Sequence, residues 1–184
     1  MSFEYLIDPA TGPQWLGQLP GKPEPYVLRR GEGEHAKLFG DLFTVLLSGD
    51  ETENQFGVIV ADSPPGDVIP THKHDATHET FFVLEGTVRL FFEDTEGAQQ
   101  TKLLAPGDFG FVPAGYAHAY QVVEPSRMMG TLSGGFERFF QHMGTPTDHT
   151  GEQPPFIPDF PRMQAAAQQH RMQFLPEHRW DVQE

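Results

Sequence analysis

The chain has 184 residues and no cysteine. This absence excludes disulfide bonds, thiolate metal sites and cysteine nucleophiles, so a metal site here would have to use nitrogen and oxygen ligands. A chain without disulfides fits the reducing environment of the cytosol.

Positive charge is scarce. The chain has 12 Lys and Arg and 26 Asp and Glu, which give a formal net charge of −14. A surface this acidic repels phosphate backbones and anionic lipid, so we expect neither nucleic acid nor a membrane surface as a partner. The charge is explained simply by solubility, and the alternative is a field that favours cations, metal ions included.

Long apolar runs are also missing. No run approaches the roughly 20 residues that span a bilayer, and the first residues, Met-Ser-Phe-Glu-Tyr-Leu, lack the basic and apolar regions of a secretory signal. We therefore expect a cytoplasmic protein.

The residues that are present predict an all-β fold. Sixteen Phe supply material for a core, and from residue 62 to 133 short apolar runs alternate with turn clusters such as Glu85-Gly86 and Pro106-Gly107-Asp108. This pattern is typical of a sandwich or a small barrel. Residues 37–47 and 55–61 are further expected strands, and the Gly- and Pro-rich residues 1–35 are expected to form an arm that wraps the body.

In two segments the pattern of residues changes from that of a strand to that of a helix. In residues 135–143, apolar side chains recur at helical spacing, and residues 161–174 are rich in Ala and Gln, which are good helix formers. Asp159 is available as a cap for the second helix, and Pro161 suits its first turn.

A histidine cluster is the strongest functional signal. His72 and His74 are alternate residues of a predicted strand, so both can face the same interior. Glu79 has the wrong parity for that strand, but a break at residues 75–77 would let it begin the next one facing the same way. His118 would have to join them from a distant strand.

Three imidazoles and a carboxylate suit Fe, Mn, Co, Ni, Cu or Zn. Burying these groups without a metal would be costly, because each would need another polar partner. The plain alternative is a set of structural histidines, which the combined spacing disfavours. Lys73 and His78 should face outward by strand parity.

The spacing matches a known family. Gly66-x5-His72-x-His74-x4-Glu79-x6-Gly86 and Gly107-x5-Pro113-x-Gly115-x2-His118 resemble the two motifs of the cupin superfamily. One departure is Val122, where the second motif usually carries an Asn that is not a ligand. The resemblance implies a single cupin, a small β-barrel or jelly roll, with an arm at 1–35, a barrel core at 36–133 and a helical extension at 134–184 packed on the barrel.

Over about residues 36–145, the chain is also similar to single-domain bacterial quercetinases, which are flavonol 2,4-dioxygenases. The segment Gly134-Gly-Phe-Glu-Arg-Phe-Phe140 contributes most to this likeness. It implies ring opening of a flavonol by O2, giving a depside and carbon monoxide. It also implies one divalent metal on His72, His74, Glu79 and His118, with Glu79 acting in addition as the catalytic base. Nickel is favoured, and Co, Mn, Fe or Cu are alternatives.

An aromatic lining would suit a flat aromatic substrate, and we select Phe81, Phe111, Tyr120 and Phe136 as candidate substrate-binding residues. Plain core packing is the alternative for each of them. Another cupin dioxygenase or isomerase, or a non-catalytic ligand-binding cupin, also stays open. A sensor is disfavoured because no helix-turn-helix or basic patch is visible, and a storage barrel because these often lose ligands. The arm and the apolar strands suggest a homodimer.

Overall fold

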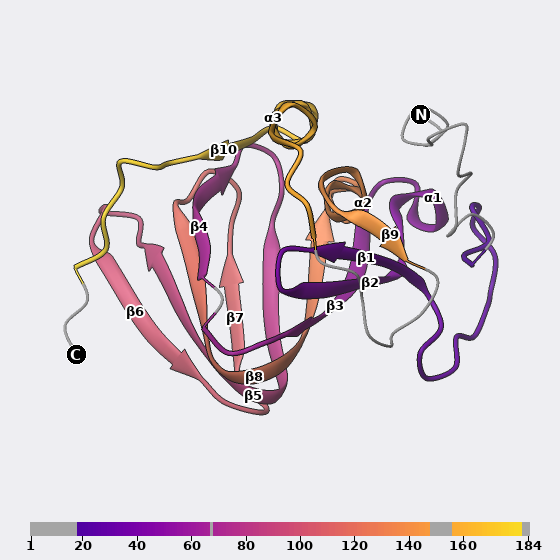
Figure 1. The fold of residues 1–184 in the computed structure, drawn as a ribbon, viewed down its shortest axis with the longest axis horizontal. Coiled ribbons are helices and arrows are strands. Elements are labelled where there is room, and N and C mark those ends of the chain that lie inside the picture. The colour runs from indigo at the N-terminus through magenta and orange to yellow at the C-terminus, as the bar shows by residue number, and fades with distance from the viewer. Residues whose placement is uncertain (1–17, 67, 148–155, 182–184) are drawn as a thin grey trace.

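The computed structural model describes residues 18–66, 68–147 and 156–181, and in these ranges the chain folds mainly into strands (Figure 1). The strands are β1 (Glu34–Leu38), β2 (Asp41–Leu47), β3 (Phe56–Ser63), β4 (Val68–His74), β5 (Glu79–Glu93), β6 (Gln99–Leu104), β7 (Phe109–Val112), β8 (His118–Ser133), β9 (Thr145–Thr147) and β10 (Met172–Phe174). The helices are α1 (Gly49–Thr52), α2 (Arg138–Met143) and α3 (Phe160–Gln169). The predicted all-β fold is confirmed.

All strand pairs in the sheet are antiparallel, and the strand order along its main path is β10-β4-β8-β3-β2-β1-β9. β5 pairs with β6, β7 and β8. The first part of β8 pairs with β4 and its second part with β3, so β8 joins the two halves of the sheet. The two halves enclose the space in which the candidate site lies.

Gly86 lets β5 follow the bend of β8. Its φ is +75°, and a Cβ at this position would lie 2.1 Å from the carbonyl oxygen of Pro125. Only glycine tolerates both conditions at low cost. The turn expected at Glu85-Gly86 is therefore wrong: β5 continues through it as one strand with irregular register.

The residues between the expected strands at 37–47 and 55–61 include the short helix α1 (Gly49–Thr52), which Ser48 precedes as N-cap. Ser48 and Glu51 make a capping box, in which the Ser48 N–H donates to Glu51 Oε2 at 2.8 Å and the Ser48 hydroxyl accepts from the Asp50 N–H. A single-turn helix of this kind gives too little periodic sequence to be recognised in advance.

The predicted helix at 135–143 begins three residues late. Gly134 and Gly135 have φ values of +72° and +77°, which end β8 in a left-handed turn and prevent an earlier start. α2 therefore covers only 138–143.

The predicted helix at 161–174 is right at its start and wrong at its end. Asp159 accepts a hydrogen bond from the Arg162 N–H at 3.0 Å, and Pro161 lies in the first turn, as expected. The helix ends at Gln169, because Arg171 adopts a left-handed φ of +53° and the chain continues as β10 beside β4. Together β9 and β10 add strands to the predicted helical extension, and β1 begins at Glu34, inside the predicted arm. Residues 1–17 of that arm lie outside the described ranges.

The core has two parts. One joins β1, β2 and β3 to α2, α3 and β10, and the other joins β5 to β7 and β8. α2 and α3 lie at the same end of the molecule, at the top in Figure 1. None of the helices in the described ranges has the length and apolar character that a membrane span requires.

Candidate metal centre and cavity

The fold brings together the four residues that the sequence singled out. His72 and His74 lie on β4, a break at 75–78 follows, and Glu79 is the first residue of β5. His118 begins β8 and is the cross-strand partner of His72. All four are buried or nearly so, and each offers one ligand atom within 4.8 Å of the others.

The shortest contacts in this cluster involve Glu79. Its Oε2 lies 3.1 Å from Nε2 of His118 and 3.2 Å from Nε2 of His74. The His72 ring is close to the same group, with its centroid 4.2 Å from that of His118 and 4.9 Å from that of His74. Four donor groups from three strands therefore converge on one point.

Backbone carbonyls fix the tautomers of two of these rings. Nδ1–H of His72 donates to the Pro70 carbonyl at 2.7 Å, and Nδ1–H of His118 donates to the Tyr116 carbonyl at 3.0 Å. Since a carbonyl can only accept, each neutral ring then has a lone pair on Nε2, directed away from that bond. This is the arrangement that orients metal-binding histidines in proteins.

The polar atoms of the cluster lack another explanation. Within the described ranges, Nδ1 of the buried His74 has no hydrogen-bond partner, and its Nε2 approaches Glu79 Oε2 at 3.2 Å without the geometry of a hydrogen bond. A neutral His118 also turns a lone pair toward the Glu79 carboxylate, which is unfavourable unless a cation lies between them. Buried polar groups are normally paired, so a divalent metal fits this donor set, and the cluster could bind one.

The pKa shifts agree with a site prepared for a cation. Burial holds the pKa of His72 well below its usual range, and charge on His118 or His74 would lower it further. Burial alone would raise the pKa of Glu79, but the close approach of the His118 and His74 rings, whose Nε2 atoms lie 3.1 and 3.2 Å from Oε2, holds it well below its usual range. At neutral pH, His72 is therefore an uncharged metal-donor group and Glu79 is an anion.

A cavity of about 270 Å³ opens onto this cluster. Small-molecule sites commonly have about 300–1,000 Å³, so this one suits a compact ligand. Its polar lining residues are His72, His74, Glu79, Thr80 and Tyr120, and the remaining described residues that line it are apolar, with no Lys or Arg among them.

Three of the four candidate substrate-binding residues line the cavity. Phe81 and Tyr120 are buried, with ring centroids 6.0 Å apart, and the Phe136 ring lies edge-on to His74 at 4.2 Å. Phe111 does not line it, because β7 alternates and turns Phe109 and Phe111 outward, where Phe111 is 53% exposed and stacks on His78. His78 and Lys73 lie outside the cluster, as expected.

Sequence reasoning missed the methionines. The five methionines of the described ranges all line the cavity, and only Met143 lies in a segment whose periodicity drew attention to it. They are Met128, Met129, Met143, Met163 and Met172. Alternation of Met172 and Phe174 was an available signal for Met172 alone, and the preceding Ala-rich helix obscured it.

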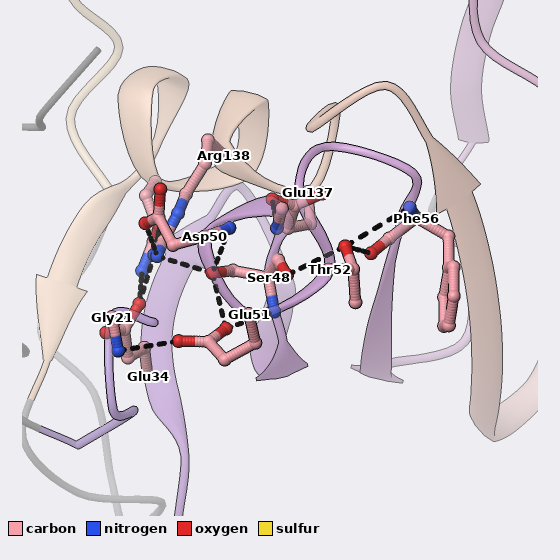
Figure 2. A network of polar contacts seen from close by, with 11 residues as sticks. Gly21, Glu34, Ser48, Asp50, Glu51, Thr52, Phe56, Glu137 and Arg138 are labelled. Atoms are coloured by element: carbon pink, nitrogen blue, oxygen red, sulfur yellow. Dashed lines mark hydrogen bonds and ion pairs between the residues drawn. The ribbon is translucent and has the colours of Figure 1, made fainter. Parts of the chain in front are cut away.

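The segment that contributes most to the quercetinase likeness, residues 134–140, takes part in a network of polar contacts. The Glu137 carboxylate accepts from the Gly49 N–H at 2.8 Å, and the Arg138 guanidinium donates to Glu34, to Asp50 at 2.9 Å and to Ser48 at 2.9 Å (Figure 2). This network joins α2 to β1 and to α1. The turn and helix that it joins to β1 and α1 carry the cavity-lining Phe136, Phe139 and Phe140.

Comparison with known proteins agrees with this geometry. The cupin domain family matches residues 59–131. Quercetin 2,3-dioxygenase of Bacillus subtilis (strain 168) is 38% identical over 133 residues, which are 71% of this chain and 38% of the relative. The protein of the same name from Aspergillus japonicus is 31% identical over 148 residues, 76% of this chain and 41% of the relative. The chain thus spans about two fifths of the length of these curated relatives.

Solved structures support the fold alone. Oxalate decarboxylase from Bacillus subtilis at pH 4.6 is 16% identical, with a TM-score of 0.50 over 63% of this chain and 31% of that one. A structure of the same enzyme, described for its Mn(II) centres, is 18% identical, with a TM-score of 0.51 over 64% and 32%. Residues 59–131 therefore form a cupin domain, and the sequence of the chain is similar to those of quercetin 2,3-dioxygenases.

Proposed function

We propose that the chain is a metal-dependent dioxygenase that opens the heterocyclic ring of a flavonol such as quercetin. One observation carries this proposal: an apolar, aromatic- and methionine-lined cavity ends on a cluster of three histidines and a glutamate. The names of the two curated relatives give independent support. In the overall reaction, both atoms of O2 enter the depside product and one ring carbon leaves as carbon monoxide.

The cavity favours a flat, uncharged substrate. Phe81, Tyr120 and Phe136 offer ring faces and edges near the cluster, and aromatic pairs prefer offset or edge-on packing. A small dianion such as oxalate would find no Lys or Arg among the described lining residues. The chain therefore resembles oxalate decarboxylase in fold, but its described cavity lining does not suit an oxalate dianion.

We assign the metal to His72, His74, Glu79 and His118. When bound, a divalent metal would supply the Lewis acidity that lowers the pKa of a substrate hydroxyl. Nickel is the metal we favour, and cobalt, manganese, iron or copper would also accept these nitrogen and oxygen donors.

Glu79 has a second role in this proposal, as the base that takes the proton of the flavonol 3-hydroxyl at Oε2. Its low pKa keeps the carboxylate ionised at neutral pH, as a proton acceptor requires. The same contacts to His74 and His118 make it a weak base, so the carboxylate must move away from these rings when it takes up the proton. The surroundings of the carboxylate are mostly buried and apolar.

The decisive experiment is a direct assay. Protein loaded separately with Ni, Co, Mn, Fe or Cu is mixed with quercetin in air, while the long-wavelength flavonol absorbance and the released carbon monoxide are followed. We expect loss of the band with one carbon monoxide per quercetin. Tight metal binding without loss of the band, for every metal, would favour a different cupin enzyme or a ligand-binding cupin.

Two further expectations belong to the proposal. We propose a homodimer, which light scattering would detect, and a cytoplasmic location, which fractionation of cells would test.

A further inference from the structure

The cavity wall has two sources in the sequence. The cupin domain at 59–131 supplies the cluster and its immediate surroundings, while segments on both sides of the domain supply the rest. The last of these segments is β10, which contributes Met172 and Phe174. It lies outside the part of the chain that the family match covers.

β10 lies directly beside the metal-ligand strand. In its antiparallel pairing with β4, Met172 is opposite His74, Gln173 opposite Lys73 and Phe174 opposite His72. Cross-strand partners share one face of a sheet, with Cβ atoms about 5 Å apart. Met172 and Phe174 therefore face the cavity with the two histidines, and Gln173 faces outward with Lys73.

The exposure of these side chains agrees with this register. Met172 is 7% exposed and Phe174 is 38% exposed, although both line the cavity. Met172 thus lies deep, next to the cluster, and Phe174 lies nearer the opening. Gln173 is exposed and does not line the cavity.

The chain on both sides of β10 fixes its position. The Asp75 N–H donates to the Arg171 carbonyl at 3.0 Å, and the Leu175 N–H donates to the Thr71 carbonyl at 2.8 Å. Further along, the Trp180 indole donates to the Thr71 hydroxyl at 2.8 Å. A backbone held at both ends places side chains reproducibly, as a selective wall requires.

We propose that β10 is the specificity-determining element of the cavity. Met172 contacts the part of the substrate next to the metal ligands and adapts to its edge, because methionine is flexible and packs well on aromatic rings. Phe174 contacts the part nearer the opening and limits its size. The proposal rests on the proposed function, since the substrate it selects is a flat aromatic one.

The absence of cysteine makes a direct test possible, because any introduced thiol is unique in the chain. In nickel-loaded protein without oxygen, the Phe174→Cys variant is labelled with iodoacetamide in the presence and absence of saturating quercetin. Gln173→Cys, on the same strand with the opposite orientation, is the matched control. We expect quercetin to slow labelling of Phe174→Cys at least tenfold and to leave Gln173→Cys unchanged.

A second measurement tests Met172. Met172→Phe should raise the dissociation constant of quercetin at least tenfold without changing the metal content, while Gln173→Phe should leave both within twofold. Binding of quercetin with equal labelling of both cysteine variants and no effect of Met172→Phe would overturn the role of β10 alone. Failure of the unmodified, metal-loaded protein to bind quercetin would overturn the proposed function and this inference with it.

Discussion

Glu79 is the residue whose two proposed roles are most easily separated. Replacement by Gln preserves size and one oxygen donor but removes the proton acceptor. We expect Glu79→Gln to retain most of the metal and to bind quercetin, and to lower the rate of ring opening by a factor of about 10²–10⁴, the usual contribution of a positioned acid or base. Metal analysis, an anaerobic binding titration and the absorbance assay measure these three properties.

Asp75→Asn is a suitable control for this experiment. Asp75 is exposed in the break between β4 and β5, only four residues from Glu79, and it does not belong to the cluster. Its replacement should leave the rate unchanged. Unimpaired ring opening by a metal-loaded Glu79→Gln protein would exclude Glu79 as the base.

His74 supports a prediction about metal removal. Its two ring nitrogens are buried, and within the described ranges Nδ1 has no hydrogen-bond partner while Nε2 approaches Glu79 without hydrogen-bond geometry, so the metal-free fold compensates this polar ring poorly. Metal at a free concentration of 100 times its dissociation constant should stabilise the fold by about 2.7 kcal/mol. For a chain of this size, that corresponds to a rise in melting temperature of roughly 5–10 °C.

Scanning calorimetry with and without nickel would measure the shift, and a chelator should reverse it. The His74→Ala variant should show a much smaller rise at the same nickel concentration. An equal rise in both proteins would place the metal elsewhere.

Among the elements, α2 depends on a buried ion pair. Arg138 donates to Glu34 and to the Gln141 amide oxygen at 2.8 Å, and both acceptor side chains are buried. Arg138→Ala would leave the Glu34 carboxylate buried without its cation. Breaking a buried pair in this way typically costs about 3–5 kcal/mol, and denaturant unfolding should show a loss of that order.

Arg30 provides the comparison, because it is an exposed arginine of the arm. Arg30→Ala should change the free energy of unfolding by less than about 0.5 kcal/mol. If the two variants lost similar stability, the network in Figure 2 would not be what anchors α2.

At the scale of elements, the sequence predicted whether a segment is a strand or a helix better than it predicted where that element begins and ends. The strands were recognisable because their apolar runs are short and bounded by turn residues, and the start of α3 was readable from Asp159 and Pro161. The end of α3 was not, because pairing with β4 overrode the helix propensity of the following residues. The irregular register near Gly86 was also hidden, since the close approach of this residue to the Pro125 carbonyl depends on pairing with a distant strand.

At the scale of the whole molecule, the cluster was predictable and the cavity largely was not. Strand parity joined His72 to His74, an assumed chain break added Glu79, and the spacing of the second motif selected His118, so all four residues of the cluster were chosen from the sequence. The cavity wall depends on how distant segments pack, so Met163 had no local signal, and the alternation of Met172 and Phe174 was obscured by the adjoining helix-forming sequence. The outward orientation of Phe111 shows the same limit, since periodicity alone does not say which face of β7 is inside.

The stability of the whole molecule should also depend on pH through His170. Burial, aided by charge on His142, lowers the pKa of His170 to about 4, whereas an unfolded chain has a histidine pKa of about 6.5. Between these values the unfolded state binds the proton and the folded state does not. Stability is therefore complete above about pH 6.5 and decreases as the pH falls toward 4.

Allowing for partial solvent exposure, this histidine should account for about 1–2 kcal/mol of the stability lost between pH 7.5 and pH 5. Denaturant unfolding of metal-free protein at the two pH values measures the total loss, and the His170→Gln variant, which cannot take up the proton, should lose less by that amount. The stability of the variant at pH 7.5 separates this effect from altered packing against Phe136 and Phe139. An equal loss in both proteins would mean that His170 titrates normally in the folded state, and that the space between α2 and α3 admits water more freely than its contacts indicate.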